Sequence, residues 1–184
     1  MIKTGDLEFI RLFEKIRAGD EEAFKEFFFI MQPYIISFLY RFTSDKEAAN
    51  DLCQETFIKF WQSREKINLS LYPKAYLYSI ARNLALNFVT RKPPVTSYDD
   101  DENLLISLSR NPEKDYDTFA LIDDLQKALN KLPERCKTTF ILSRFDGFEY
   151  SEIADIMNVS LQTVKNQMNK AISVLRKHLS SKLD

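Results

Sequence analysis

The sequence predicts an all-α protein made of two small helical domains. The chain of 184 residues is 45% hydrophobic, so it can bury a core, and its length allows one domain or two small ones. It contains only 3 glycines, whereas folds built from strands and tight turns usually need more. Long stretches without Gly or Pro have apolar residues at helical spacing, which indicates helices.

The composition argues against several classes of function. No window approaches the roughly 20 apolar residues that cross a bilayer, so we expect a cytoplasmic protein without membrane insertion. Cys53 and Cys136 are far apart in the chain and are expected to be reduced, buried thiols. His178 is the only histidine, and we see no nucleophile–base pair or phosphate loop. We therefore expect no enzyme, no metal and no cofactor.

The stretch SDKEAANDLCQETFIKFWQSREKI predicts a helix in the N-terminal half. Ser44 and Glu47 have capping-box spacing at its start. Leu52, Thr56 and Phe60 recur on one inward face. A different side carries Asp51, Gln54, Glu55, Ile58 and Gln62, with Phe57 and Trp61 beside it. Aromatic residues outside the main stripe indicate a helix that packs on two sides or binds a partner, and periodicity favours the two-sided core.

The next predicted helix begins near Pro73, in PKAYLYSIARNLALNFVTRK. Its core stripe is Leu77, Ala81, Leu84 and Phe88. A neighbouring side carries Tyr76, Asn83, Asn87 and Thr90. The cations Arg82, Arg91 and Lys92 lie near them, with no acid nearby. A ring can stack on any base and an amide can read its edge, so this side suits bases splayed out of a duplex. A helical tyrosine is equally at home at a core boundary, and both interpretations of Tyr76 stay open.

Residues 93–117 are predicted to be a linker. They combine paired prolines with an acidic run and have no sustained apolar period. The linker divides the chain into an N-terminal helical domain at 6–92 and a smaller, four-helix domain at 118–184.

The first two helices of the C-terminal domain are predicted in TFALIDDLQKALNKL and PERCKTTFILSRFDG. Pro133 suits the first turn of the second helix, and Gly147 suits the position just after its end.

A helix-turn-helix is predicted next. Ser151 is expected to cap a short helix over residues 152–157, after which the apolar pattern stops and restarts at once. Asn158 can adopt the left-handed conformation at the break, and Ser160 can cap the helix that follows. Two helices joined by so tight a turn cross steeply.

The outward side of the second helix is wholly polar or cationic: Gln162, Thr163, Lys165, Asn166, Gln167, Asn169 and Lys170. In a major groove, amides and hydroxyls read base edges while lysines meet phosphates. Most polar helix faces are merely solvated. Here the turn chemistry and the absence of any acid from Ser160 to Lys182 favour DNA binding.

Together these stretches resemble the extracytoplasmic-function group of bacterial RNA polymerase sigma factors, within the sigma-70 family. The similarity is carried by DLCQETFIKFW, YLYSIARNLALNFV, the acidic linker and LPERCKTTFILSRFDGFEYSEIADIMNVSLQTVKNQMNKA, in this order, from about Asp6 to Leu179. The resemblance implies a transcription initiation factor that binds core polymerase and directs it to promoters through minus-10 and minus-35 elements.

The resemblance also implies roles for individual residues. Docking on the clamp of the polymerase's largest subunit is assigned to Asp51, Gln54, Glu55 and Trp61. Binding of the melted minus-10 element is assigned to Tyr76, Arg82, Asn83 and Asn87. Binding of the minus-35 duplex is assigned to Ser160, Gln162, Thr163, Lys165, Asn166, Gln167 and Lys170. Gln167 and Asn169 stand in a stretch where many relatives carry arginine, which leaves the base preference open.

Further partners follow from the resemblance alone: the flap of the second polymerase subunit and an anti-sigma factor, with a monomer expected when the chain is free. Two other classes compete. The first is a helix-turn-helix regulator that binds DNA without polymerase, which would not explain the function of the helix at residues 51–61. A sigma mimic that titrates an anti-sigma protein could dispense with the cations and amides found on both candidate DNA-binding helices.

Overall fold

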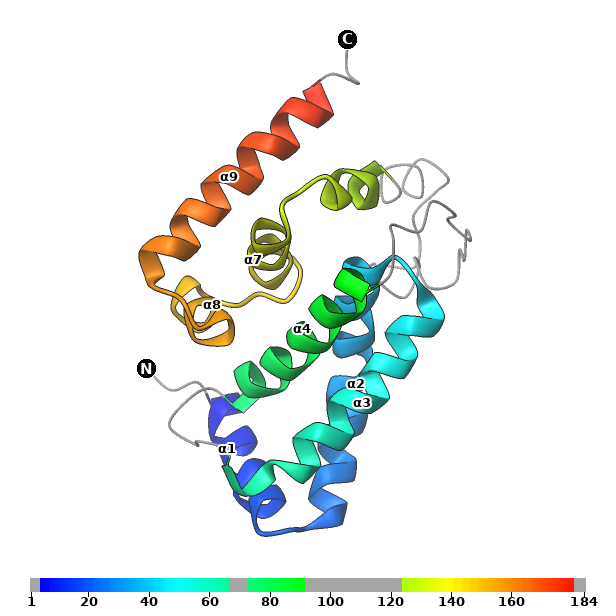
Figure 1. Cartoon of the computed structure of the whole chain (residues 1–184). Helices are drawn as coiled ribbons and strands as arrows, with labels where there is room; N and C mark the ends of the chain where they lie inside the picture. The colour runs from blue at the N-terminus through cyan, green and yellow to red at the C-terminus, as the bar shows by residue number, and fades with distance from the viewer. Residues whose placement is uncertain (1–3, 67–72, 92–123, 181–184) are drawn as a thin grey trace, which may run out of the picture.

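The computed structural model describes residues 4–66, 73–91 and 124–180, and its regular secondary structure in these ranges is entirely helical (Figure 1). The N-terminal elements are α1 (Thr4–Arg17), α2 (Glu21–Thr43), α3 (Lys46–Gln62), the short 3₁₀ helix η1 (Arg64–Lys66) and α4 (Pro73–Arg91). The C-terminal elements are α7 (Glu134–Arg144), α8 (Tyr150–Met157) and α9 (Leu161–Ser180), preceded by helical residues 124–130. The all-α prediction is confirmed for these ranges, whereas the predicted linker at 93–117 lies outside them. None of the described helices is long and apolar enough to cross a membrane.

Aromatic side chains fill the core between α1, α2 and α3. The ring centroids of Phe13 and Phe27 are 4.8 Å apart, and those of Phe27 and Phe60 are 5.2 Å apart. On a second side of α3, Phe57 is buried and packs edge-on against Phe28 at 4.7 Å. The two-sided core predicted for α3 is confirmed, and burying each ring contributes about 1.5–3 kcal/mol to folding.

Two predicted helix caps are wrong by one or two positions. Ser44 adopts a left-handed conformation (φ 56°) that ends α2, so Asp45 caps α3 instead and accepts a hydrogen bond from the Ala48 N–H at 2.9 Å. Helix α8 starts at Tyr150, so Ser151 lies inside it. The cap of α8 is Glu149, whose N–H donates to the Glu152 carboxylate at 2.7 Å in a reciprocal capping box.

The turn of the helix-turn-helix follows the prediction. Asn158 has φ 52°, and the Ser160 hydroxyl accepts a hydrogen bond from the Thr163 N–H at 3.1 Å. Gly147 has φ 74°, as expected after the end of α7, while Pro133 stands just before the first turn of α7 and not within it.

The C-terminal helices pack directly on the N-terminal ones. Helix α8 lies against α4, and α7 lies against the end of α2 (Figure 1). Buried residues of α8, such as Ile153 and Met157, belong to the same apolar cluster as Leu77 and Ala81 of α4. The apolar core is therefore continuous between the two halves of the chain.

Candidate nucleic-acid interface

Helix α9 turns its polar side outward because an apolar stripe holds its other side inward. Val164, Met168, Ala171 and Leu175 are buried. On the opposite side, Ser160, Gln162, Lys165, Asn166 and Lys170 are exposed, and Thr163 and Gln167 are half-buried. The seven residues that sequence reasoning assigned to the minus-35 element thus lie together on and just before the first turns of one helix.

A surface hollow of about 580 Å³ lies between this face of α9 and the start of α7. Its α9 side is lined by Thr163, Asn166, Gln167 and Lys170, and its α7 side by residues 133–136. Arg135 is exposed at the rim, and sequence reasoning missed it. The available signal was a cation in the first turn of the helix that precedes the helix-turn-helix.

Hydrogen bonds hold two amides of this face. The Gln162 Nε2 donates to the Asn166 Oδ1 at 3.0 Å along the helix. The hydroxyl of Thr139, on α7, donates to the Gln167 Oε1 at 2.8 Å. Thr139 is fully buried, so Gln167 is tethered to the body of the protein while Asn166 stands free of it.

Replacing Thr139 with Val is expected to loosen Gln167 without altering the shape of the core. Thr139→Val should lower base discrimination by less than about 1.4 kcal/mol, because one net hydrogen bond is worth about that much, and by less than Gln167→Ala does. The loss of discrimination is measured by the binding of minus-35 variants to both single mutants and the double mutant. If Thr139→Val changes discrimination equally in a Gln167→Ala background, the tether is not the cause.

The predicted minus-10 residues on α4 differ in exposure. Asn83 and Asn87 are exposed, whereas Tyr76 is half-buried with its ring 6.0 Å from that of Phe60. Arg82 is half-buried, and its Nη1 donates to the Asn83 Oδ1 at 3.2 Å. Burial lowers the pKa of Arg82, partly offset by the nearby carboxylate of Glu134 on α7. Tyr76 therefore occupies the core boundary, and only the two asparagines are fully open.

The predicted polymerase-docking residues form an exposed strip on α3. Asp51, Gln54 and Glu55 are exposed, and Ile58 beside them is 55% exposed. Glu55 pairs with Lys59 at 2.9 Å.

Trp61 does not share that exposure. Its ring packs on Phe24 at 4.8 Å and lies under the Arg64 guanidinium at 4.5 Å. The aromatic residue is half-buried because the start of α2 covers it.

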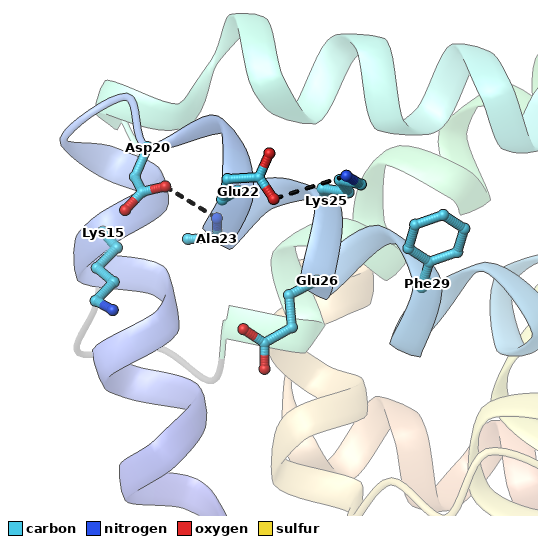
Figure 2. A pocket seen from close by; sticks show the side chains of 7 residues that line it. All are labelled: Lys15, Asp20, Glu22, Ala23, Lys25, Glu26 and Phe29. Atoms are coloured by element: carbon cyan, nitrogen blue, oxygen red, sulfur yellow. Dashed lines mark hydrogen bonds and ion pairs between the residues drawn. The ribbon is translucent and has the colours of Figure 1, made fainter.

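A second hollow lies at the junction of α1 and α2, with a volume of about 360 Å³ (Figure 2). Asp20 caps α2 there by accepting from the Ala23 N–H at 3.0 Å, and Glu22 pairs with Lys25 at 3.7 Å. Lys15 and Glu26 also line it, so its charges are of mixed sign. Within the described part of the chain, no group of His, Cys, Asp and Glu could hold a metal ion.

Comparison with known proteins identifies the two halves separately. Residues 28–93 match the family model described as Sigma-70 region 2, and residues 122–175 match Sigma-70, region 4. The RNA polymerase sigma factor SigV of Bacillus subtilis (strain 168) is 30% identical over 148 residues, which cover 80% of this chain and 84% of SigV. The ECF RNA polymerase sigma factor SigW of the same strain is 26% identical over 175 residues, covering 90% of this chain and 94% of SigW.

Solved structures share the fold. CnrH in complex with the cytosolic domain of CnrY matches with a TM-score of 0.72 at 15% identity, over 94% of this chain and 97% of CnrH. The sigma factor RpoE of Bartonella quintana, in complex with the anti-sigma factor NepR, matches with a TM-score of 0.70 at 22% identity, over 86% of this chain and 98% of RpoE. Matches to both sigma regions, together with relatives similar along most of their length, show that the chain belongs to the extracytoplasmic-function group of sigma-70 family RNA polymerase sigma factors and acts in transcription initiation.

Proposed function

We propose that this sigma factor binds core RNA polymerase through α3 and reads a promoter with two separate surfaces. The observation that carries the proposal is the α9 face: amides and lysines are exposed on one side while the opposite stripe is buried. Lysines there can neutralise phosphates and amides can read base edges in the major groove. The minus-35 duplex is the proposed ligand of this face, through the seven residues named above.

Polymerase docking and minus-10 binding are proposed for the N-terminal helices. Asp51, Gln54 and Glu55 are exposed side by side on α3 and are proposed to dock on the clamp of the largest polymerase subunit, with Trp61 packed at the edge of the site. Asn83 and Asn87 of α4 are proposed to hold bases of the melted minus-10 element, supported by Arg82 and Tyr76. The proposed units are residues 6–92 and 118–184, joined by 93–117.

The proposed setting is the cytoplasm, where a non-catalytic initiation factor meets polymerase and promoter. Regulation by an anti-sigma factor is proposed because a solved protein of the same fold, the Bartonella quintana RpoE, is bound to the anti-sigma factor NepR. A flap contact of the C-terminal unit and a monomeric free state complete the proposal.

The test is co-purification with core polymerase followed by transcription from candidate promoters, including one upstream of the chain's own gene. Polymerase binding with promoter-dependent transcripts supports the proposal. Binding to an anti-sigma protein without transcription from any promoter would instead favour a sigma mimic, and duplex binding without polymerase would favour an independent regulator.

Replacing Asn83 with Ala is expected to reduce open-complex formation while sparing minus-35 duplex binding. Asn83 is exposed on α4, so its loss removes one base contact without opening a cavity, at a cost of about 1–3 kcal/mol. Permanganate footprinting of the melted region and duplex binding measure the two effects. Equal loss in both assays would contradict the assignment of strand capture to α4.

A further inference from the structure

Leu161 is the first residue of α9, and its side chain is 44% exposed. Among residues 161–178, where the structure describes the side chains of this helix, it is the one large apolar side chain that is exposed. Leu161 belongs to neither buried apolar cluster, whereas Val159, just before it in the turn, is half-buried and packs against one of them. Sequence reasoning assigned Leu161 no role.

The first turn of α9 holds Leu161 in a fixed position. The Ser160 hydroxyl accepts a hydrogen bond from the Thr163 N–H at 3.1 Å, and the Ser160 carbonyl accepts one from the Val164 N–H at 3.1 Å. Val164 is fully buried and anchors this turn to the body of the protein. Because an α-helix has 3.6 residues per turn, Leu161 and the exposed Lys165 lie on the same side of α9, one turn apart.

The neighbours of Leu161 are residues that are proposed to contact the minus-35 duplex. Ser160 and Gln162 adjoin it in the chain, Lys165 follows one turn later, and all three are exposed. In helix-turn-helix proteins, the N-terminal residues of the second helix contact base edges in the major groove. Leu161 occupies such a position, but its side chain cannot form a hydrogen bond and carries no charge.

The major groove presents one apolar group to such a side chain, which is the C5-methyl group of thymine. The other base edges carry hydrogen-bond donors and acceptors there. Contact between a leucine and this methyl group removes apolar surface of both from water, which favours binding. A single exposed leucine is common on protein surfaces, so the position of Leu161 among base-reading residues is what indicates the contact.

We propose that Leu161 is a specificity-determining residue that selects a 5-methylpyrimidine, which is thymine in unmodified DNA, in the minus-35 element. The proposal rests on the proposed function, because it requires α9 to lie in the major groove. Leu161 and Asn166 are separated along the helix axis by about 7.5 Å, or about two base-pair steps of B-DNA. The selected thymine is therefore expected within about three base pairs of the base that Asn166 reads.

The experiment removes methyl groups from the DNA one at a time. The full chain with core polymerase first selects its preferred duplexes from a library that is randomised across the minus-35 element. Each thymine of a selected duplex, on either strand, is then replaced by deoxyuridine, which forms the same base pair and lacks only the methyl group. One replacement should weaken binding about fourfold, the worth of one buried methyl group, and the others should change binding little.

Leu161→Ala should bind the thymine and deoxyuridine duplexes equally at that position, because the side chain that covers the methyl group is gone. Val89→Ala is the matched control, since it shortens a side chain that is 40% exposed on α4, and it should keep the fourfold difference. Circular dichroism checks that both variants stay helical. The salt dependence of binding should not change in Leu161→Ala, because leucine carries no charge.

The nearest other methyl group on this face belongs to Thr163, whose hydroxyl lies 2.8 Å from that of Ser160. Thr163→Ser deletes this methyl group and keeps the hydroxyl. If Thr163→Ser abolishes the thymine–deoxyuridine difference and Leu161→Ala does not, the thymine is read by Thr163 and the role of Leu161 is overturned.

A rescue arm restores the methyl group on a different base. The selected T·A pair is replaced by C·G, with cytosine in one duplex and 5-methylcytosine in the other. The parent should bind the methylated duplex about fourfold more tightly, whereas Leu161→Ala should bind both alike.

Two sets of results would contradict the proposal, and they are distinguishable. A selected sequence in which no thymine methyl group affects binding, or a difference that is equal in the parent and in Leu161→Ala, overturns the role of Leu161 and leaves the proposed function supported. The absence of any sequence selection across the minus-35 element contradicts the proposed function and the role of Leu161 together.

Discussion

Asn166→Ala is expected to lower discrimination between minus-35 variants by about 1–3 kcal/mol on the preferred sequence, with little effect on others. Asn166 is exposed in the hollow between α7 and α9, and its Oδ1 is oriented by Gln162 at 3.0 Å. An oriented amide reads a base edge, which supplies sequence information and carries no charge. The salt dependence of binding should therefore stay nearly unchanged.

Lys170→Ala is the matched comparison, because a lysine that meets phosphate supplies affinity without sequence information. It should weaken all promoter variants alike and lower the salt slope by about one unit. Lys177→Ala, in the last turn of the same helix and away from the hollow, is the control. Promoter-variant transcription titrated at several salt concentrations separates the two effects. Uniform weakening by Asn166→Ala with discrimination preserved would assign that residue to the phosphate backbone instead.

Replacing Gln54 and Glu55 together with Ala is expected to weaken binding to core polymerase by about tenfold or more, as for residues at the centre of an interface. Both side chains are exposed on α3 and point away from the buried Leu52, Thr56 and Phe60. The fold should therefore remain, with at most the small loss of the Glu55–Lys59 pair.

The control for docking is the Glu21→Ala, Glu22→Ala double variant. It also removes two exposed side chains, in this case from the first turn of α2. Affinity for core polymerase and helical content by circular dichroism are measured for both variants. Parent-like affinity of the α3 variant, or equal weakening by the control, would show that docking does not depend on this strip.

Local signals determined much of the architecture. The break between α8 and α9 depends on Asn158 and Ser160, whose preferences act within one turn, so the helix-turn-helix was predictable residue by residue. The outward face of α9 followed from periodicity in the same way. The caps predicted at Ser44 and Ser151 were wrong because a nearby acidic residue caps each helix instead. Capping propensity alone does not choose between candidates so close in the chain.

The exposure of the candidate site residues was only partly predictable. Periodicity separates the inner from the outer side of a helix, and this was enough to predict that Gln54, Glu55 and Asn166 are exposed. It does not predict which side chains pack against a residue at the boundary between the two sides. Trp61 and Tyr76 are half-buried because Phe24 and Phe60 lie against them, and those contacts depend on how helices pack.

The helices, the helix-turn-helix and the family could be predicted from the amino-acid sequence, because each depends on short-range preferences or on an ordered set of motifs. Which distant residues are in contact depends on how the helices pack. Tyr78 bonds Asp146 across 68 positions of the chain, Thr139 tethers Gln167, and Arg82 lies beside Glu134. Such pairs leave no periodic trace, since their energies arise only when two separately formed surfaces exclude water from each other.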